Sequence, residues 1–460
     1  MSNFVNSTDD VTQTGSIYVD SLLWGSRWKI ENDSRKITYS FVDNKSWDDN
    51  FDNTEINAFT NAIQAWANVA NFQLEYSGFN DSQAELTFHS VDSSIFDSDG
   101  VLGQAEPPGE SSNPFAEGDV LINWEYYQYY PDSELLVGSY YYYTFIHEIG
   151  HALGLAHPHD NGGGSSIFPG VDNASDAGDL NLNQFVTTIM SYNTQLSPYS
   201  PGYKANWGFA AGPMAFDIAA IQHIYGINRS FNTGNNFYSL PSFNGVGTYW
   251  SCIWDAGGTD TISGQEASNS VIIDLNNATL ANNDPNAGGF ISQVVGVSGG
   301  FTIANSQEGI CVIENAIGSY FNDTLIGNEY NNYLSGEDGN DVINGGAGND
   351  ILVGGAGGDR FTFQSGSEGI DWITDFNVLE DSIVVSAAGF GGGLVAGATI
   401  AANNFAIGTA ATTSSQRFIY NTGNGSLFFD QDGTGAIAKI EIATLNTGLF
   451  LNNADIVVVA

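Results

Sequence analysis

A nine-residue repeat between Asn322 and Phe363 limits the possible folds of this chain more than any other feature. Polar residues, mostly aspartate, recur every nine positions, and a large apolar residue follows each of them two positions later. The repeated pairs are Asp323 and Leu325, Asn332 and Leu334, Asp341 and Ile343, Asp350 and Leu352, and Asp359 and Phe361. Stretches rich in Gly, Asn and Asp bury too little apolar surface to become ordered alone, whereas the residues around each apolar position suit a very short strand. Each unit is therefore expected to be stable only when it is stacked on copies of itself.

The repeat also contains the ligands that calcium prefers. Glycine permits a tight loop whose carbonyl groups point inward, and each aspartate adds a charged oxygen, so two stacked turns can surround a calcium ion with about six oxygen ligands. A flexible glycine-rich linker is the simpler alternative, but it needs neither the nine-residue phase nor the periodic Leu and Ile. The sequence therefore predicts calcium ligands at Gly336, Gly339, Asp341, Gly345, Gly346, Gly348, Asp350, Gly354, Gly355, Gly357 and Asp359.

The turns that flank the best repeats depart from this pattern. Two of the glycines expected before Asp323 are absent, and Asn332 replaces an aspartate. These turns therefore lack either the tight glycine loop or the charged oxygen that a calcium site needs. We expect them to bind calcium weakly or only to cap the stack.

Composition supports a folded protein and argues against several classes. Of the 460 residues, 10 are Lys or Arg and 52 are Asp or Glu, which gives a net charge of −42. This charge argues against nucleic acid and anionic membranes as partners. Because only 13% of the residues are charged and 42% are hydrophobic, the chain does not resemble a disordered protein. No apolar run is long enough to span a membrane, and the first thirty residues lack the pattern of a secretory signal.

The chain divides by composition near residue 240. All six histidines lie before this position, and Gly, Asn and Asp dominate after it. In the first half, alternating apolar residues predict short strands, and apolar residues at helical spacing predict two helices, the first with Asp52 or Thr54 as N-cap. The strands are expected at 37–42, 72–76, 85–90 and 119–124, and the helices at 56–67 and 145–153. Strands interleaved with helices indicate an α/β or α+β domain, and we predict domains at residues 21–240 and 241–460.

The second helix carries a set of histidines with the spacing of a metal site. His147 and His151 are four residues apart, so one face of the helix presents both imidazoles to one metal ion. Gly154 can end the helix in a left-handed conformation, which lets the chain turn and bring His157 back as a third ligand. Three neutral histidines leave one position open for water, which is typical of catalytic rather than structural zinc. The alternative, that these histidines merely fill or cap a helix, does not require this spacing.

Glu148 follows the first of these histidines and is the candidate general base. It is close enough to hold a water molecule beside the metal without being needed for coordination. His159 falls outside the ligand spacing, and we expect it in a loop facing solvent. His89 and His223 are expected to have ordinary structural roles.

The motif from His147 to Pro158, together with TIMSYN at Thr188–Asn193, resembles the metzincin zinc proteases. Specifically, it resembles the serralysin branch, in which such a domain is joined to RTX calcium repeats. The resemblance extends to residues 37–41, 216–226 and 254–262, and so covers nearly the whole chain. It implies an α+β zincin protease domain with a mixed sheet, followed by an all-β domain built as a parallel β-roll.

The resemblance also implies roles for two residues of the TIMSYN segment. Met190 is the methionine of the turn beneath the zinc and has a packing role. Tyr192 is a tyrosine that ligates zinc at rest and moves away when substrate binds, after which its phenol can donate a hydrogen bond to the developing oxyanion. Considered alone, Met190 is a core methionine and Tyr192 an ordinary turn tyrosine.

Further calcium ligands follow from the resemblance alone. Those for a site at the start of the roll are Asp255, Gly257, Asp260 and Glu314, and those for the last calcium-binding turn are Asp371 and Asp381. Asn232 and Asn235 stand where the family usually has an arginine and an aspartate, so part of the first site departs from the family pattern. The alternative is that these carboxylates lie on the surface.

The function implied by the resemblance is that of a secreted zinc endopeptidase, stabilised by several calcium ions, that cleaves proteins and peptides. It also implies a short propeptide, for which residues 1–20 are the candidate, and a C-terminal signal at residues 455–460 that a one-step bacterial exporter reads. A proteinaceous inhibitor is a further expected partner, and a monomer is the expected state. Because 42 excess negative charges repel one another, we expect low calcium to favour the unfolded, export-competent chain and millimolar calcium outside the cell to favour the folded one.

Two other classes of protein are alternatives to this expectation. A calcium-dependent adhesion or matrix protein would retain a vestigial zinc domain, but the catalytic set His147, Glu148, His151 and His157 is complete. A toxin-like module would use the repeat to reach membranes, but the charge and the lack of an amphipathic basic segment argue against it. Loss of casein cleavage in Glu148→Ala, with zinc content unchanged, distinguishes the peptidase from both.

Overall fold

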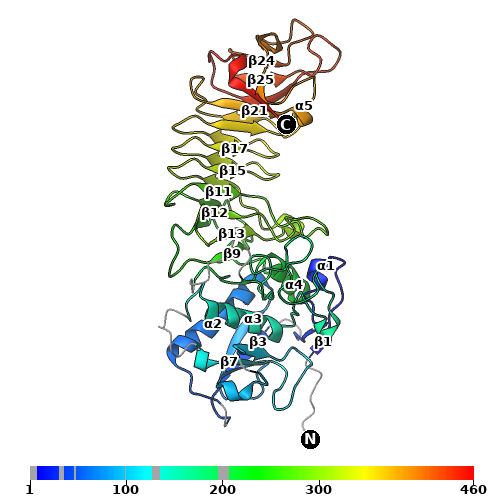
Figure 1. Ribbon diagram of the computed structural model, residues 1–460, viewed down its shortest axis with the longest axis vertical. Helices are drawn as coiled ribbons and strands as arrows, with labels where there is room; N and C mark the ends of the chain where they lie inside the picture. The colour runs from blue at the N-terminus through cyan, green and yellow to red at the C-terminus, as the bar shows by residue number, and fades with distance from the viewer. Residues whose placement is uncertain (1–7, 31–35, 46–47, 99, 127–134, 195–206) are drawn as a thin grey trace.

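The computed structural model describes residues 8–30, 36–45, 48–98, 100–126, 135–194 and 207–460. The molecule is elongated (Figure 1). Helices and a small sheet from the first half of the chain form a rounded body at one end, which we call the zinc body. Stacked strands from the second half extend away from it toward the C-terminal residue. The first strand of this stack is β8, Phe237–Ser239.

A five-stranded mixed sheet forms the centre of the zinc body, in the order β4-β3-β5-β7-β6. The four strands expected from alternation are present, and they run parallel to one another. They are β3, Lys36–Val42, β4, Gln73–Phe79, β5, Leu86–Val91, and β7, Asp119–Asn123. β6, Gly103–Ala105, runs antiparallel to β7 at the edge of the sheet. The sequence does not predict β6, because three residues are too few to show alternation. The mixed sheet confirms the expected fold class.

Helices α2, Asn53–Val69, and α3, Tyr140–Ala152, confirm the two helices expected from apolar periodicity. Asp52 is the N-cap of α2, because its carboxylate accepts from the backbone N–H of Glu55 at 2.8 Å. The two helices pack through stacked rings of Phe59 and Phe145, whose centroids are 4.3 Å apart. A third helix, α4, spans Ala215–Tyr225. The contact between α2 and α3 buries the helix that carries the histidines within the zinc body.

The N-terminal residues described, from residue 8 onward, are part of the zinc body. They form β1, Thr8–Asp10, α1, Ile17–Asp20, and β2, Ser26–Trp28. β1 and β2 pair antiparallel, and Tyr18 and Val19 of α1 are only 2% and 3% exposed. Of the described part of the candidate propeptide, residues 8–20, only Tyr18, Val19 and Asp20 are buried, so this segment is anchored to the zinc body through α1.

Two ten-stranded sheets form the second half of the chain, and we call this body the roll. Successive repeats enter opposite sheets, so neighbours within a sheet are 18 residues apart. One sheet contains β14, Asn315–Ile317, β16, Tyr333–Ser335, β18, Ile351–Val353, and β20, Asp371–Ile373; the other contains β15, Thr324–Ile326, β17, Val342–Asn344, β19, Arg360–Phe363, and β21, Ser382–Ser386. The apolar residue of each repeat is fully buried between the sheets. This confirms that the repeats form a stack with their apolar residues inside.

Longer segments extend the roll at both ends. Next to the zinc body are β9, Trp250–Ile253, β10, Thr261–Ser263, β11, Val271–Asp274, β12, Ser292–Val294, and β13, Gly300–Ile303. At the far end are α5, Ala387–Phe390, β22, Ala398–Thr399, β23, Phe405–Ile407, β24, Phe418–Tyr420, β25, Ser426–Phe429, β26, Ile440–Thr444, and β27, Ile456–Val459. β27 pairs with β21 in parallel, so the last residues form a strand of the sheet. Among the described helices, none has the length and apolar character that crossing a bilayer requires.

Candidate metal centre

The three histidines predicted as zinc ligands meet at one point. His147 Nε2 lies 3.2 Å from the Nε2 atoms of both His151 and His157, and the latter two are 2.9 Å apart. Each Nδ1 has another partner at 2.8–2.9 Å: the carbonyl oxygen of Ile189, the carbonyl oxygen of Leu155, and Asp160 Oδ2, respectively. Because Nδ1 donates these bonds, the lone pair of each Nε2 is available to a shared ion. The donor set fits the zinc ion of such a site.

Gly154 makes the turn that returns His157, as the sequence predicts. Its φ is +103°, and a Cβ at this position would lie 2.6 Å from the carbonyl oxygen of Ser26. Glycine is therefore required both by the left-handed backbone and by the close approach of the N-terminal segment.

Burial sets the protonation of the ligands and of Glu148. It lowers the pKa of His147 to about 3, with a smaller contribution from His157, and it lowers the pKa of His151 well below its usual value. Both imidazoles are thus neutral, as metal ligation requires. Burial also raises the pKa of Glu148 to about 8, because a low dielectric disfavours the carboxylate.

A cleft passes the histidines along β6. It comprises two cavities of about 390 and 450 Å³ that share Gly103, Glu148 and Tyr192 in their lining. A Cβ at Gly103 would lie 2.7 Å from Glu148 Cγ, so the glycine leaves room for the glutamate beside the edge strand. The smaller cavity is otherwise lined mainly by Leu102, Tyr140, Tyr143, Thr144 and Ser191, and the larger by Trp24, Ala105, Pro107, Asp160 and Asn161.

The turn formed by Thr188–Asn193, here called the Met turn, lies beneath the histidines. Met190 is fully buried, and a Cβ at Gly150 of α3 would lie 2.7 Å from its sulfur. Tyr143 donates to the carbonyl oxygens of Ile189 and Ser191 at 2.8 and 2.6 Å. Met190 therefore packs against the segment of α3 between the two ligands, as its packing role predicts.

Asp217 of α4 anchors this turn, although the sequence analysis did not single it out. It accepts from Thr188 Oγ1 at 2.6 Å and from the N–H groups of Ile189 and Met214 at 2.7 and 2.8 Å. Burial raises its pKa to about 7, against the opposing effect of these hydrogen bonds. The only sequence signal is an acidic residue within an otherwise apolar helix start, where a helix N-terminus favours negative charge.

Tyr192 lies beside the ligands, as the resemblance implies. Its ring centroid is 4.7 Å from that of His157 and 5.6 Å from that of His147. Burial and the charge of Glu148 raise the pKa of its phenol.

His159 does not face solvent, so that expectation is wrong. Its side chain is 7% exposed, and its ring stacks on His157 with centroids 4.7 Å apart and contacts Tyr192 at the same distance. Spacing from the motif cannot reveal this contact, because Tyr192 comes from a distant part of the chain. His89 and His223 have structural surroundings, His89 between Asp48 and Asp119 and His223 near the carbonyl oxygen of Thr12.

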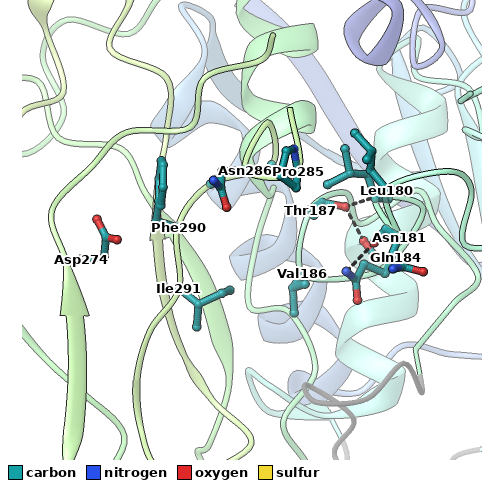
Figure 2. A pocket seen from close by; sticks show the side chains of 13 residues that line it. Leu180, Asn181, Gln184, Val186, Thr187, Asp274, Pro285, Asn286, Phe290 and Ile291 are labelled. Atoms are coloured by element: carbon teal, nitrogen blue, oxygen red, sulfur yellow. Dashed lines mark hydrogen bonds between the residues drawn. The ribbon is translucent and has the colours of Figure 1, made fainter. Parts of the chain in front are cut away.

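A third cavity, of about 410 Å³, lies outside the cleft, where the segment before the Met turn faces a loop of the roll (Figure 2). Gln184 and Thr187 line one side, and Asn286 and Phe290 the other. Gln184 and Thr187 bond carbonyl oxygens of their own segment. Among the described residues, no histidine or cysteine lines this cavity, so we assign it no metal chemistry.

The repeat turns contain carboxylate oxygens that lack hydrogen-bond partners. In Asp341, Asp350 and Asp359, Oδ1 accepts at 2.8–2.9 Å from the N–H 18 residues earlier. The Oδ2 atom of each is buried and unpaired within the described part of the chain. Burial raises the pKa of Asp341 to about 7 and those of the other two to about 6. Such oxygens destabilise a fold unless a cation pairs with them, so these residues fit calcium.

The predicted glycines lie against the same oxygens. A Cβ at Gly336, Gly345 or Gly354 would come within 2.2–2.3 Å of the Oδ2 of Asp341, Asp350 or Asp359 in the same order. The other predicted glycines, which all have positive φ, are Gly339, Gly346, Gly348, Gly355 and Gly357. Stacking of the turns leaves no room for side chains, since a Cβ at Gly357 would lie 1.6 Å from the carbonyl oxygen of Gly339.

Hydrogen bonds satisfy the polar side chains of the two divergent turns. The Asn332 side chain accepts from the N–H of Asn328 at 2.8 Å and donates to the carbonyl oxygen of Glu314 at 3.1 Å. In the other turn, the hydroxyl of Ser319 donates to Asp323 at 2.9 Å. These contacts support the prediction that these turns bind calcium weakly.

The four aspartates implied by the resemblance are buried rather than on the surface, and Glu314 is partly buried. Asp255 and Asp260 are inaccessible, and Asp371 and Asp381 are 3% and 8% exposed. Glu314 accepts from the N–H of Asp260, whose Oδ2 is a further buried, unpaired oxygen. The hydroxyl of Tyr238 donates to Asp255 at 2.6 Å and accepts from Asn232 at 3.0 Å, so a phenol contacts one of the carboxylates expected at the first site. Gly257 donates its N–H to Asp255.

Asp371 and Asp381 continue the ladder of the repeat. Asp371 Oδ1 accepts from the N–H of Asp350 at 3.2 Å, and Asp381 Oδ1 from that of Asp359 at 2.9 Å. Burial and the neighbouring charge of Asp350 raise the pKa of Asp371 to about 8. The structure thus brings both residues to the stacked turns. The two cysteines, Cys252 and Cys311, are buried and not bridged.

The fold and the three-histidine site define a metzincin zinc metalloprotease joined to calcium-binding RTX repeats. The family model described as matrixin matches residues 27–180, and the model for the RTX calcium-binding nonapeptide repeat (4 copies) matches residues 317–352 and 326–361. Together they imply catalytic zinc in the zinc body and calcium in the roll.

Comparison with known proteins narrows this class to one family. The chain is 39% identical to serralysin C of Dickeya chrysanthemi over 75% of its own length and 69% of that protein. It is 32% identical to a serralysin of Photorhabdus luminescens over 79% and 73% of the two chains. Identity to a serralysin of Proteus mirabilis is 29%, and the chain spans 61% of the length of that protein. The chain belongs to the serralysin family.

Proposed function

We propose that this protein is a secreted zinc endopeptidase that hydrolyses peptide bonds in proteins, with Glu148 as general base and calcium as a stabiliser of the roll. The observation that carries this proposal is the convergence of three Nε2 atoms within 3.2 Å of one another beside a buried glutamate. This arrangement opens into a cleft along an edge strand.

Zinc, Glu148 and Tyr192 have separate roles in the proposed reaction. When zinc is bound, it supplies Lewis-acid chemistry, lowering the pKa of a water molecule and polarising the scissile carbonyl group. Glu148 accepts the proton of the attacking water and passes it to the leaving amine. The phenol of Tyr192 donates a hydrogen bond to the oxyanion, a contact worth about 3 kcal/mol in other hydrolases.

The edge strand supports the binding of many different sequences. β6 ends the sheet beside Glu148, and its outward backbone groups can pair with an extended peptide. Backbone pairing is independent of side chains, so it favours broad specificity. We infer that substrates lie along β6 and cross both cavities of the cleft.

Calcium binding is proposed to couple folding to secretion. The unpaired oxygens of the repeat aspartates and the net charge of −42 both disfavour the folded chain without cations. A chain that folds only in external calcium remains export-competent inside the cell. Residues 455–460 are the proposed signal for a one-step exporter, and residues 1–20 the proposed propeptide segment. The proposed division into domains is 21–240 and 241–460, and an inhibitor protein would bind the cleft.

The test uses purified protein loaded with zinc and calcium. Denatured casein is incubated with the wild type, with the wild type plus o-phenanthroline, and with Glu148→Ala, while Glu75→Ala on the exposed strand β4 is the matched control. We expect cleavage by the wild type and the control only, with zinc content equal in both glutamate variants. Cleavage by Glu148→Ala at the wild-type rate would reject the general base. A folded, zinc-loaded wild type without cleavage would favour the adhesion or matrix protein.

A further inference from the structure

The larger cavity of the cleft, on the side of His157, combines one aromatic and one acidic wall. Trp24 comes from the N-terminal segment, and Asp160 and Asn161 follow the third zinc ligand. No Lys or Arg of the described residues lines either cavity of the cleft. A side chain entering this cavity therefore meets an indole ring and a carboxylate, with no lysine or arginine among the described lining residues.

Trp24 is held in place by the residues that lead to His157. The backbone N–H of Trp24 donates to the carbonyl oxygen of Gly154 at 3.0 Å, and the backbone N–H of Ala156 donates to the carbonyl oxygen of Leu22 at 2.9 Å. The indole packs against the loop after Asp160, because a Cβ at Gly162 would lie 2.4 Å from Trp24 Cζ3. The ring is thus a fixed wall of the cleft rather than a free surface side chain.

Asp160 is fixed as well. Oδ2 accepts from His157 Nδ1 at 2.9 Å and Oδ1 from the N–H of Gly162 at 2.9 Å. Its side chain is nevertheless 44% exposed, so the carboxylate retains lone pairs toward the cavity. An ionised carboxylate near an aromatic face is the environment that binds ammonium and guanidinium groups.

We propose that the Trp24–Asp160 cavity is a subsite that selects a basic side chain, lysine or arginine, on one side of the scissile bond. This inference rests on the proposed peptidase function and names the substrates that the peptidase prefers. The cation lies over the indole of Trp24 and against the carboxylate of Asp160. The net charge of −42 acts in the same direction, because it attracts cationic segments of substrate toward the cleft.

The experiment first identifies which substrate position the subsite accepts and then tests the effect of the side-chain charge at that position. The zinc- and calcium-loaded protein digests a pool of peptides, and mass spectrometry identifies the residues on both sides of each cleaved bond. Matched fluorogenic peptides then place arginine, citrulline, norleucine or glutamate at the selected position. Citrulline has nearly the shape of arginine without its charge, so this pair tests the carboxylate without any change in the protein. We expect kcat/KM to be about tenfold higher for arginine than for citrulline, and lowest for glutamate.

The protein side is tested at Trp24. Trp24→Leu is expected to reduce the arginine preference about fivefold while the norleucine peptide changes less than twofold, and Trp24→Phe is expected to retain most of the preference. Circular dichroism and zinc content verify that both variants are folded and loaded. Titration calorimetry of the arginine and citrulline peptides with Glu148→Ala gives the same comparison as binding, without turnover.

The outcomes separate this subsite from the peptidase itself. Cleavage of casein with equal rates for arginine, citrulline and norleucine peptides would overturn the subsite and leave the peptidase intact. An equal loss for all peptides in Trp24→Leu would also overturn it, since Trp24 would then act only on the fold. Cleavage of neither casein nor any peptide would overturn the proposed function and this subsite with it.

Discussion

Asp217 joins the Met turn to the start of α4 with one buried side chain. The Asp217 carboxylate accepts from the N–H of Ile189, and the carbonyl oxygen of Ile189 accepts from His147 Nδ1. Asp217 therefore helps to position a zinc ligand through Ile189. In Asp217→Asn, one of the three donors faces an NH₂ group, and we expect the free energy of unfolding to fall by about 1–3 kcal/mol. Thermal unfolding in saturating zinc and calcium measures this, with the exposed Asp10→Asn as control. An unchanged Tm would show that the turn is held by other contacts.

Protonation of His89 makes the stability of the zinc body depend on pH, independently of the metal sites. Burial opposes its protonation, but hydrogen bonds to Asp119 and Asp48 and their charges outweigh this effect and raise its pKa above 6.5. The stability from this charged group is therefore fully present below pH 6.5 and is lost as the pH rises through the raised pKa.

We expect His89→Asn to lower the free energy of unfolding more at pH 6 than at pH 8.5. Urea unfolding at both values, with metals saturating, provides the measurement, and the exposed His223→Asn is the control. The same loss at both pH values would contradict a charged His89 in the folded state.

Residues of the candidate site differ in how far sequence predicts them. His147, His151 and His157 follow from helical spacing and one glycine turn, which are local features. Gly103 and Trp24 reach the site from segments far apart in the chain, so no local pattern marks them, and the acidic helix start that contains Asp217 does not reveal its contact with the Met turn. The wrong expectation for His159 has the same cause, because its burial depends on Tyr192.

Among the elements, the repeat turns differ in whether their polar side chains are satisfied by hydrogen bonds. The turn with Asp359 leaves a carboxylate oxygen unpaired, whereas the turn with Asn332 uses amide hydrogen bonds. We expect Asp359→Asn to raise the calcium concentration needed for folding of the roll, because a charged ligand is lost. Calcium titration followed by circular dichroism tests this, with the exposed Asp338→Asn as control. Equal midpoints for all three proteins would exclude Asp359 as a ligand.

Elements with a strong period were predicted, and elements without one were missed. The repeat strands and helices α2 and α3 follow from periods of nine residues and of about 3.6 residues. β6 and most strands after Ser386 are short, and their pairing depends on partners elsewhere in the roll, such as β22 on β27. Their sequences contain no period that marks the partner.

For the whole molecule, calcium is expected to decide whether the roll is folded. Excess EGTA removes the cations that pair with the buried oxygens, so we expect the β-sheet circular dichroism to be lost and to return when calcium is added. Magnesium at equal concentration is the control, because it is smaller, holds its water ligands tightly and is rarely bound by cages made only of protein oxygens. A spectrum unchanged by EGTA would reject calcium as a stabiliser.

The assignment of successive repeats to opposite sheets limits how this molecule can change in length. Removing nine residues would move every later strand to the wrong sheet, whereas removing 18 leaves the remaining pairs in register. Relatives and engineered versions should therefore differ by whole pairs of repeats. Each pair changes the distance between the zinc body and the far end by one strand spacing, about 4.8 Å. The roll is thus a spacer whose length is adjustable in fixed steps without altering the chemistry at either end.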